Sequence, residues 1–150
     1  MPQKLDFHWI LPGKLAQGAR PKPAIEAFGP FDVVVFTAME YQPPLRALPR
    51  SKKAVYVPMD DNPYQPVSAA DAKRVRDIAA LLAKDVLAGR RVLITCQMGA
   101  NRSGLVTGMT LRALGHGGDA AVALIRERRI LGGGEKALFN PVFAAFVAAR

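Results

Sequence analysis

Short apolar runs and longer amphipathic stretches alternate along the chain, and together they predict strands followed by helices. Apolar runs of four to eight residues between turn-forming residues are typical of buried strands. Strands are predicted at Lys14 to Gly18, Asp32 to Ala38, Ala54 to Pro58 and Arg91 to Cys96. The last three contain valine or isoleucine, whose β-branched side chains favour extended backbone.

Apolar residues at helical spacing predict two helices in the middle of the chain. The first follows Ser68, which forms a loose capping box with Asp71, and Gly89 ends it. The second runs from Arg102 to Leu114, with apolar side chains recurring on one face. Each is therefore expected to pack against the predicted strands.

Two further helices are predicted near the end of the chain. Asp119 is expected to cap a helix that runs through Arg129, and Asn140 with Pro141 forms a good start for the last helix. Strands thus alternate with helices early, and helices cluster late. This order predicts an α/β fold, a central, mainly parallel sheet flanked by helices on both faces.

Length and composition indicate one domain over residues 1–150, because half of the residues are apolar and no linker divides them. No apolar run is long enough to span a membrane and no signal peptide is visible, so a cytoplasmic location without membrane contact is expected. A single cysteine excludes an intramolecular disulfide. One cysteine and two distant histidines, His8 and His116, argue against a zinc site with cysteine and histidine ligands, and no run of acidic residues has the spacing of a carboxylate-rich metal site.

The formal net charge of +9 favours anionic partners, including phosphorylated substrates and nucleic acid. Aromatic residues make up 7% of the chain, and no RNA-binding signature is present. Nucleic acid is therefore a secondary candidate partner, and the sequence does not indicate an oligomeric state.

Candidate chemistry is concentrated where the strand ending at Cys96 meets the helix starting at Arg102. Ligands of α/β proteins bind at the carboxyl ends of strands, and a helix start offers unpaired N–H groups to an anion. A glycine in such a loop lets the backbone curve closely around the ligand. The phosphate cradle is therefore predicted to consist of Gln97, Met98, Gly99, Ala100, Asn101 and Arg102.

Three side chains of this segment suit phosphoryl transfer. The Cys96 thiol lies where positive potential favours the thiolate, which is the nucleophilic form. Arg102 can offer two parallel N–H donors to phosphoryl oxygens. The Ser103 hydroxyl can donate to the sulfur. The competing interpretation is a buried, inert cysteine before an ordinary helix.

The segment resembles the signature of the protein tyrosine phosphatase superfamily, Cys-x5-Arg followed by Ser or Thr. The resemblance implies two-step hydrolysis of phosphate monoesters through a phosphocysteine, without metal or organic cofactor. It implies a phosphorylated protein or peptide as partner, with phosphotyrosine as first candidate and phosphoserine or phosphothreonine as second. The family usually has histidine before the nucleophile, whereas Thr95 stands here, and this departure bears on how readily the thiolate forms.

The proton donor is sought in Val57-Pro58-Met59-Asp60-Asp61. In the compact dual-specificity phosphatases, the acid lies three residues after a proline that ends a strand. Counting from Pro58 selects Asp61, and Asp60 is the second candidate. From the residues alone, both acids also suit a solvated turn before Pro63.

The rest of the chain also resembles these small phosphatases. Residues 9–16 resemble their opening hairpin, 31–37 the next strand, 125–129 an arginine-bearing helix end, and 140–143 the last helix. The arginines at 126, 128 and 129 are expected either to meet a second anionic group or to be solvated. The order of motifs excludes low-molecular-weight tyrosine phosphatases, and the loop length argues against rhodaneses. The lack of lysine inside the loop argues against phosphoinositide phosphatases.

Two alternative functions remain. An RNA 5′-phosphatase on the same fold would suit the basic charge. A phosphate-binding module without turnover would suit the missing histidine before Cys96.

Overall fold

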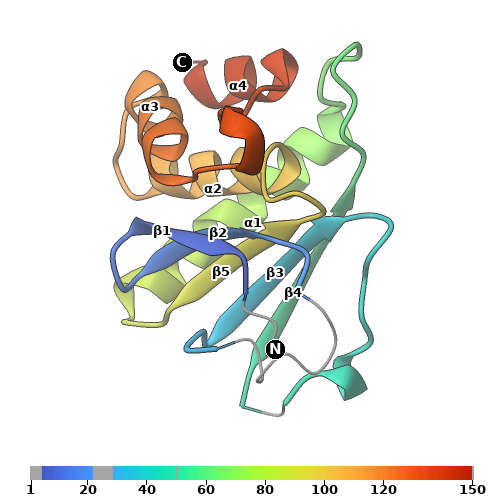
Figure 1. Ribbon diagram of the computed structural model, residues 1–150, viewed down its shortest axis with the longest axis vertical. Helices are drawn as coiled ribbons and strands as arrows, with labels where there is room; N and C mark the ends of the chain where they lie inside the picture. The colour runs from blue at the N-terminus through green and yellow to red at the C-terminus, as the bar shows by residue number, and fades with distance from the viewer. Residues whose placement is uncertain (1–4, 22–28, 50, 150) are drawn as a thin grey trace.

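The computed structural model describes residues 5–21, 29–49 and 51–149 (Figure 1). The strands are β1 (Phe7–Leu11), β2 (Leu15–Ala19), β3 (Val33–Ala38), β4 (Lys53–Met59) and β5 (Val92–Cys96). The helices are α1 (Ala69–Leu87), α2 (Arg102–Ala113), α3 (Gly118–Arg128) and α4 (Pro141–Ala148), with short 3-10 turns at η2 (Leu45–Ala47) and η3 (Gly132–Gly134). Within the described residues, none of these helices combines the length and the apolar character needed to cross a bilayer.

The five strands form one mixed sheet in the order β1-β2-β5-β3-β4. The β1–β2 pair is antiparallel, and the other three pairs are parallel. The four strands predicted from apolar runs are confirmed, and β1 completes the hairpin that the resemblance to phosphatases implied. Because β5 lies in the middle of the sheet, its carboxyl end lies between the ends of β2 and β3.

All four described α-helices pack against the same face of the sheet, although helices were expected on both. Alternate β3 residues such as Val33 and Val35 point into a core shared with side chains from α1, α2, α3 and α4. Val34 and Phe36 point to the opposite face, where the described core residues come from strands and loops. Aromatic side chains cover much of that face, including Phe31, which is fully buried.

Helix starts follow the predicted capping residues in two of three cases. The Ser68 hydroxyl accepts a hydrogen bond from the Asp71 N–H at 3.1 Å, and Asn140 caps α4 with its side-chain oxygen. The prediction for Asp119 is wrong, because it lies within the first turn of α3. Gly117 is the N-cap there and makes no side-chain hydrogen bond. An acidic side chain in a first turn instead interacts favourably with the helix dipole.

Candidate active site

The loop between Cys96 and Arg102 turns sharply at Gly99, whose φ of +72° lies in the left-handed region. A Cβ atom at Gly99 would lie 2.5 Å from Nη2 of Arg129 and 2.5 Å from the carbonyl carbon of Gly18. Both the backbone conformation and the close packing therefore require glycine at this position.

Two buried side chains hold the backbone carbonyls of the loop. Gln17 donates through Nε2 to the Gly99 oxygen at 3.0 Å and the Ala100 oxygen at 3.3 Å. Arg129 donates through Nε to the Gly99 oxygen at 3.0 Å and through Nη2 to the Met98 oxygen at 2.9 Å. In a trans peptide the N–H points away from the C=O, so carbonyls fixed on the outside turn N–H groups toward the inside. The result is a concave row of donors suited to an anion.

Arg129 is only 1% exposed, so it neither meets a second anionic group nor lies at a solvated helix end. Asp6 balances its charge, with Oδ1 accepting from Nη1 at 2.7 Å. His8 Nδ1 lies 3.0 Å from the same nitrogen. Burial, and then the charge of Arg129, lower the pKa of His8 below its ordinary value. A neutral His8 can accept a hydrogen bond from Arg129.

The sulfur of Cys96 lies 3.1 Å from the hydroxyl oxygen of Ser103, as the sequence predicted for this pair. Thr95 directly precedes Cys96 at the end of β5. Its hydroxyl donates to the Val35 oxygen at 2.7 Å, and its carbonyl accepts from the Thr37 hydroxyl at 2.8 Å. The Thr95 side chain therefore joins β5 to β3 and leaves Ser103 as the hydroxyl beside the sulfur.

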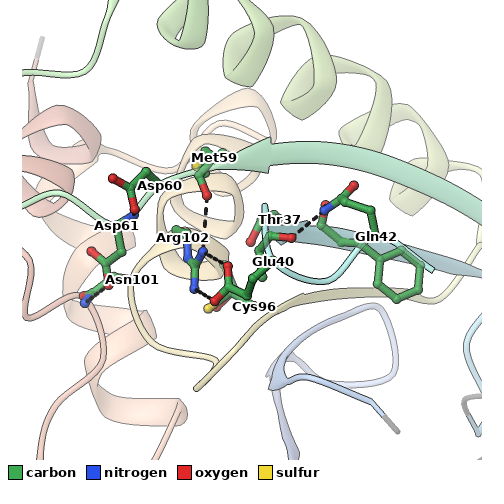
Figure 2. Close-up of polar contacts among 12 residues, drawn as sticks. Thr37, Glu40, Gln42, Met59, Asp60, Asp61, Cys96, Asn101 and Arg102 are labelled. Carbon is green, nitrogen blue, oxygen red and sulfur yellow. Dashed lines mark hydrogen bonds and ion pairs between the residues drawn. The ribbon is translucent and has the colours of Figure 1, made fainter. Parts of the chain in front are cut away.

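Arg102 is held by a residue that the sequence analysis did not select. Its Nη1 and Nη2 donate to the two carboxylate oxygens of Glu40, the latter at 2.8 Å, and Nη1 also reaches the Met59 oxygen at 3.2 Å (Figure 2). The hydrogen bond from Arg102 lowers the pKa of Glu40 to about 2. An acidic residue just beyond β3, at the sheet edge that carries Cys96, was the available signal for Glu40.

The remaining nitrogen of Arg102, Nε, is buried and has no hydrogen-bond partner among the described residues. A buried donor without a partner is costly, so such an atom indicates a ligand. Nη2 also keeps one of its two hydrogens when the other is bonded to Glu40. Arg102 can therefore offer Nε and Nη2 side by side to two phosphoryl oxygens.

Asp61 is the acid that the structure brings to the cradle. Its Oδ2 accepts from Asn101 Nδ2 at 3.0 Å, and its Oδ1 accepts from Asn140 Nδ2 at 2.7 Å (Figure 2 shows the Asn101 side). Asp60 is exposed, and its Oδ1 accepts from the Asp61 N–H at 2.9 Å. Asp60 thus shapes the turn while Asp61 contacts the loop. Asn140, which the sequence predicted only as a helix cap, is part of this site.

The predicted cradle residues divide into an outer and an inner group. Gln97 is exposed, and Met98 is 52% exposed, so these two side chains lie at the mouth. Gly99, Ala100 and Asn101 are buried and shape the inner wall.

No protein-family model and no curated protein matches this chain, but solved structures of phosphatases resemble it. Human DUSP28 superimposes with a TM-score of 0.72 and 23% sequence identity, covering 97% of this chain and 93% of its own. Tk-PTP in its active form has a TM-score of 0.74 and 22% identity, covering 95% and 93%. OH1 from the Orf virus, described as a tyrosine phosphatase with triple substrate specificity, has a TM-score of 0.67 and 18% identity, covering 97% and 87%.

The superpositions cover almost all of the present chain, so the likeness extends over the whole arrangement of strands and helices. At identities of 18 to 23%, the likeness establishes the fold. The chain has the fold of the small dual-specificity phosphatases.

Proposed function

We propose that the protein is a cysteine-dependent phosphatase that hydrolyses phosphate monoesters through a phosphocysteine intermediate. The observation that carries the proposal is the convergence of three groups on one cradle. Cys96 and Arg102 stand at the two ends of the cradle loop, and Asn101 of the same loop donates a hydrogen bond to Asp61. The Nε of Arg102 is buried without a partner among the described residues. Each group suits one requirement of phosphoryl transfer, namely a nucleophile, a charge clamp and an acid.

In the first step the Cys96 thiolate attacks phosphorus, the S–P bond forms and the bond to the leaving oxygen breaks. Arg102 and the loop N–H groups bind the equatorial oxygens, where negative charge is spread in the transition state. Asp61 gives its proton to the leaving oxygen. The alcohol or phenol departs, and the phosphoryl group remains on sulfur.

In the second step water hydrolyses the phosphocysteine. Asp61, now a carboxylate, takes a proton from the water as the water attacks phosphorus. The S–P bond breaks and the sulfur leaves as thiolate. A hydrogen bond from Ser103 stabilises that thiolate, and the 3.1 Å distance between the two side chains supports this role. Inorganic phosphate is then released.

The substrates proposed are phosphotyrosine, and secondarily phosphoserine and phosphothreonine, in proteins or peptides. OH1 and a mouse structure described as a putative dual-specificity phosphatase in complex with zinc tungstate support this class. A second candidate is a 5′-phosphate of RNA, which the net charge of +9 favours.

The test is a panel of three substrates with the purified protein, namely para-nitrophenyl phosphate, phosphopeptides and 5′-triphosphorylated RNA. We expect turnover of the first two and little of the third. Faster turnover of the RNA than of the phosphopeptides would mean that RNA, and not phosphorylated protein, is the substrate class. Binding of phosphate or vanadate without turnover of any substrate would show a phosphate-binding module instead of an enzyme.

A further inference from the structure

The Asp61 carboxylate lies between two asparagine side chains that come from different parts of the chain. Asn101 belongs to the cradle loop, and Asn140 belongs to the start of α4. Their amide nitrogens lie 3.0 and 2.7 Å from the two oxygens of Asp61. Each carboxylate oxygen therefore has its own amide donor.

Backbone N–H groups fix which way both amides face. Asn101 Oδ1 accepts from the Asn140 N–H at 2.8 Å. Asn140 Oδ1 accepts from the N–H groups of Val142 and Phe143 at 2.9 and 3.2 Å. With each oxygen held by a backbone donor, each NH₂ group must face Asp61. The arrangement is a clamp with two jaws, Asn101 and Asn140.

The loop that carries Asp61, residues 60–66, is largely exposed, so packing alone does not hold it in place. Asp60 and residues 63–66 are exposed, and Asp61 itself is half-buried. The backbone of Leu138, two residues before Asn140, has a φ of +57°, which is unusual for a residue with a side chain. Its N–H donates to the Ala100 oxygen at 3.1 Å, so the strained turn ties the start of α4 to the cradle. Both jaws of the clamp are thus tied to the cradle loop.

We propose that Asn101 and Asn140 are positioning residues for the acid, placing Asp61 against the leaving oxygen and, later, against the attacking water. This inference rests on the proposed phosphatase function. Acid–base catalysis requires the acid within hydrogen-bond reach of the reacting oxygen, so loss of one jaw lowers the rate of proton transfer. Loss of the Asn140 jaw should leave binding of the phosphoryl group unchanged, because that binding uses Arg102 and the cradle loop.

The kinetic test is Asn140→Ser, which keeps a hydroxyl to cap α4 but removes the Nδ2 donor. We expect kcat to fall about tenfold for alkyl phosphates and less than about twofold for para-nitrophenyl phosphate, with KM unchanged, because phenolates with low pKa need little protonation. Asn62→Ser is the matched control in the same loop, since Asn62 bonds to the Tyr64 N–H and not to Asp61.

In an Asp61→Asn background, Asn140→Ser should cause no further loss, because the group it positions is already disabled. Equal losses on both substrates, or losses that add to those of Asp61→Asn, would overturn the inference and assign Asn140 a structural role.

A second measurement detects the hydrogen bonds of the clamp directly and needs no enzymatic activity. In ¹⁵N-resolved NMR spectra, Asp61→Ala should shift the side-chain amide signals of Asn101 and Asn140. The Gln42 amide, which donates to the Ala38 oxygen at 2.6 Å, should not move. Unmoved Asn101 and Asn140 signals would overturn the clamp. If the signals shift but the protein hydrolyses no phosphate monoester, the hydrogen bonds of the clamp exist but have no catalytic role. That result would also overturn the proposed function.

Discussion

Glu40 accepts hydrogen bonds from the two terminal nitrogens of Arg102, while Nε of the same guanidinium is buried and has no partner in the part of the chain that the structure describes. The side chain of Arg102 is 9% exposed, whereas that of Glu40 is 46% exposed. Glu40 therefore holds the arginine from its solvent side and sets the orientation of the whole guanidinium.

Replacement of Glu40 by glutamine should lower kcat/KM about tenfold, equal to about 1.4 kcal/mol of transition-state stabilisation. Glutamine is of similar size but accepts through one oxygen only, so it cannot hold both nitrogens of Arg102. Steady-state kinetics with para-nitrophenyl phosphate check this result. Unchanged kinetics would mean that the phosphate itself orients Arg102.

The same pair has a defined pH dependence. The folded protein lowers the pKa of Glu40 from 4.5 to about 2, so the carboxylate contributes stability above about pH 4.5. That contribution is lost as pH falls from 4.5 through 2. The difference in midpoint denaturant concentration between the wild type and Glu40→Gln should therefore narrow over this range. A constant difference would show that the ion pair contributes nothing, as many half-exposed pairs do.

Cys96→Ser should abolish turnover and leave binding of a phosphate analogue largely intact. The hydroxyl is a poor nucleophile at neutral pH, while the loop N–H groups and Arg102 remain. Turnover and tungstate binding by calorimetry measure the two properties separately. Near-normal turnover of the variant would exclude Cys96 as the nucleophile.

Asp61→Asn should lower kcat for alkyl phosphates by about 10²-fold or more, within the usual range of acid–base catalysis. Aryl phosphates with good leaving groups should lose less. Asp60→Asn is the neighbouring control, and it should have a much smaller effect because Asp60 is exposed and bonds only to the turn. The reverse order would assign the acid to Asp60.

The cradle could be predicted from sequence because its parts are close together along the chain. Cys96, Gly99 and Arg102 follow one apolar strand and open one helix, so local pattern suffices. Glu40 lies 62 positions from Arg102, and Gln17 lies 82 positions from Gly99. Those contacts depend on which strands are neighbours in the sheet, and apolar periodicity does not specify strand order.

The three arginines at the end of α3 have different surroundings, which their charge pattern does not distinguish. The sequence predicted either contact with a second anionic group or a solvated helix end for all three, and of these only Arg128 is exposed. Arg129 is buried because Asp6, at a distance of 123 positions, supplies its counter-charge. Arg126 donates to the carbonyl oxygens of Ala137 and Leu138, so it also supports the turn before α4.

Peroxide should inactivate the protein and modify Cys96, because sulfenic acid can no longer attack phosphorus. The chain has one cysteine, so an intramolecular disulfide cannot protect the oxidised sulfur. Added thiol should restore activity only at early times, before irreversible acids form. Bound vanadate should slow the loss by covering the sulfur. Mass spectrometry of the Cys96 peptide over time measures the oxidation of the sulfur. A protein that stays active and unmodified in peroxide would contradict the prediction.

The contacts of Arg129 have a consequence for the growing polypeptide. Ribosomes make Cys96 and Arg102 before Arg129, whose side chain holds the carbonyls of Met98 and Gly99. A nascent chain that stops short of residue 129 carries Cys96, Arg102 and the support from Gln17, but it lacks the second side chain that holds the loop carbonyls. We therefore expect the loop to reach its final shape only after α3 has been synthesised and has packed against it.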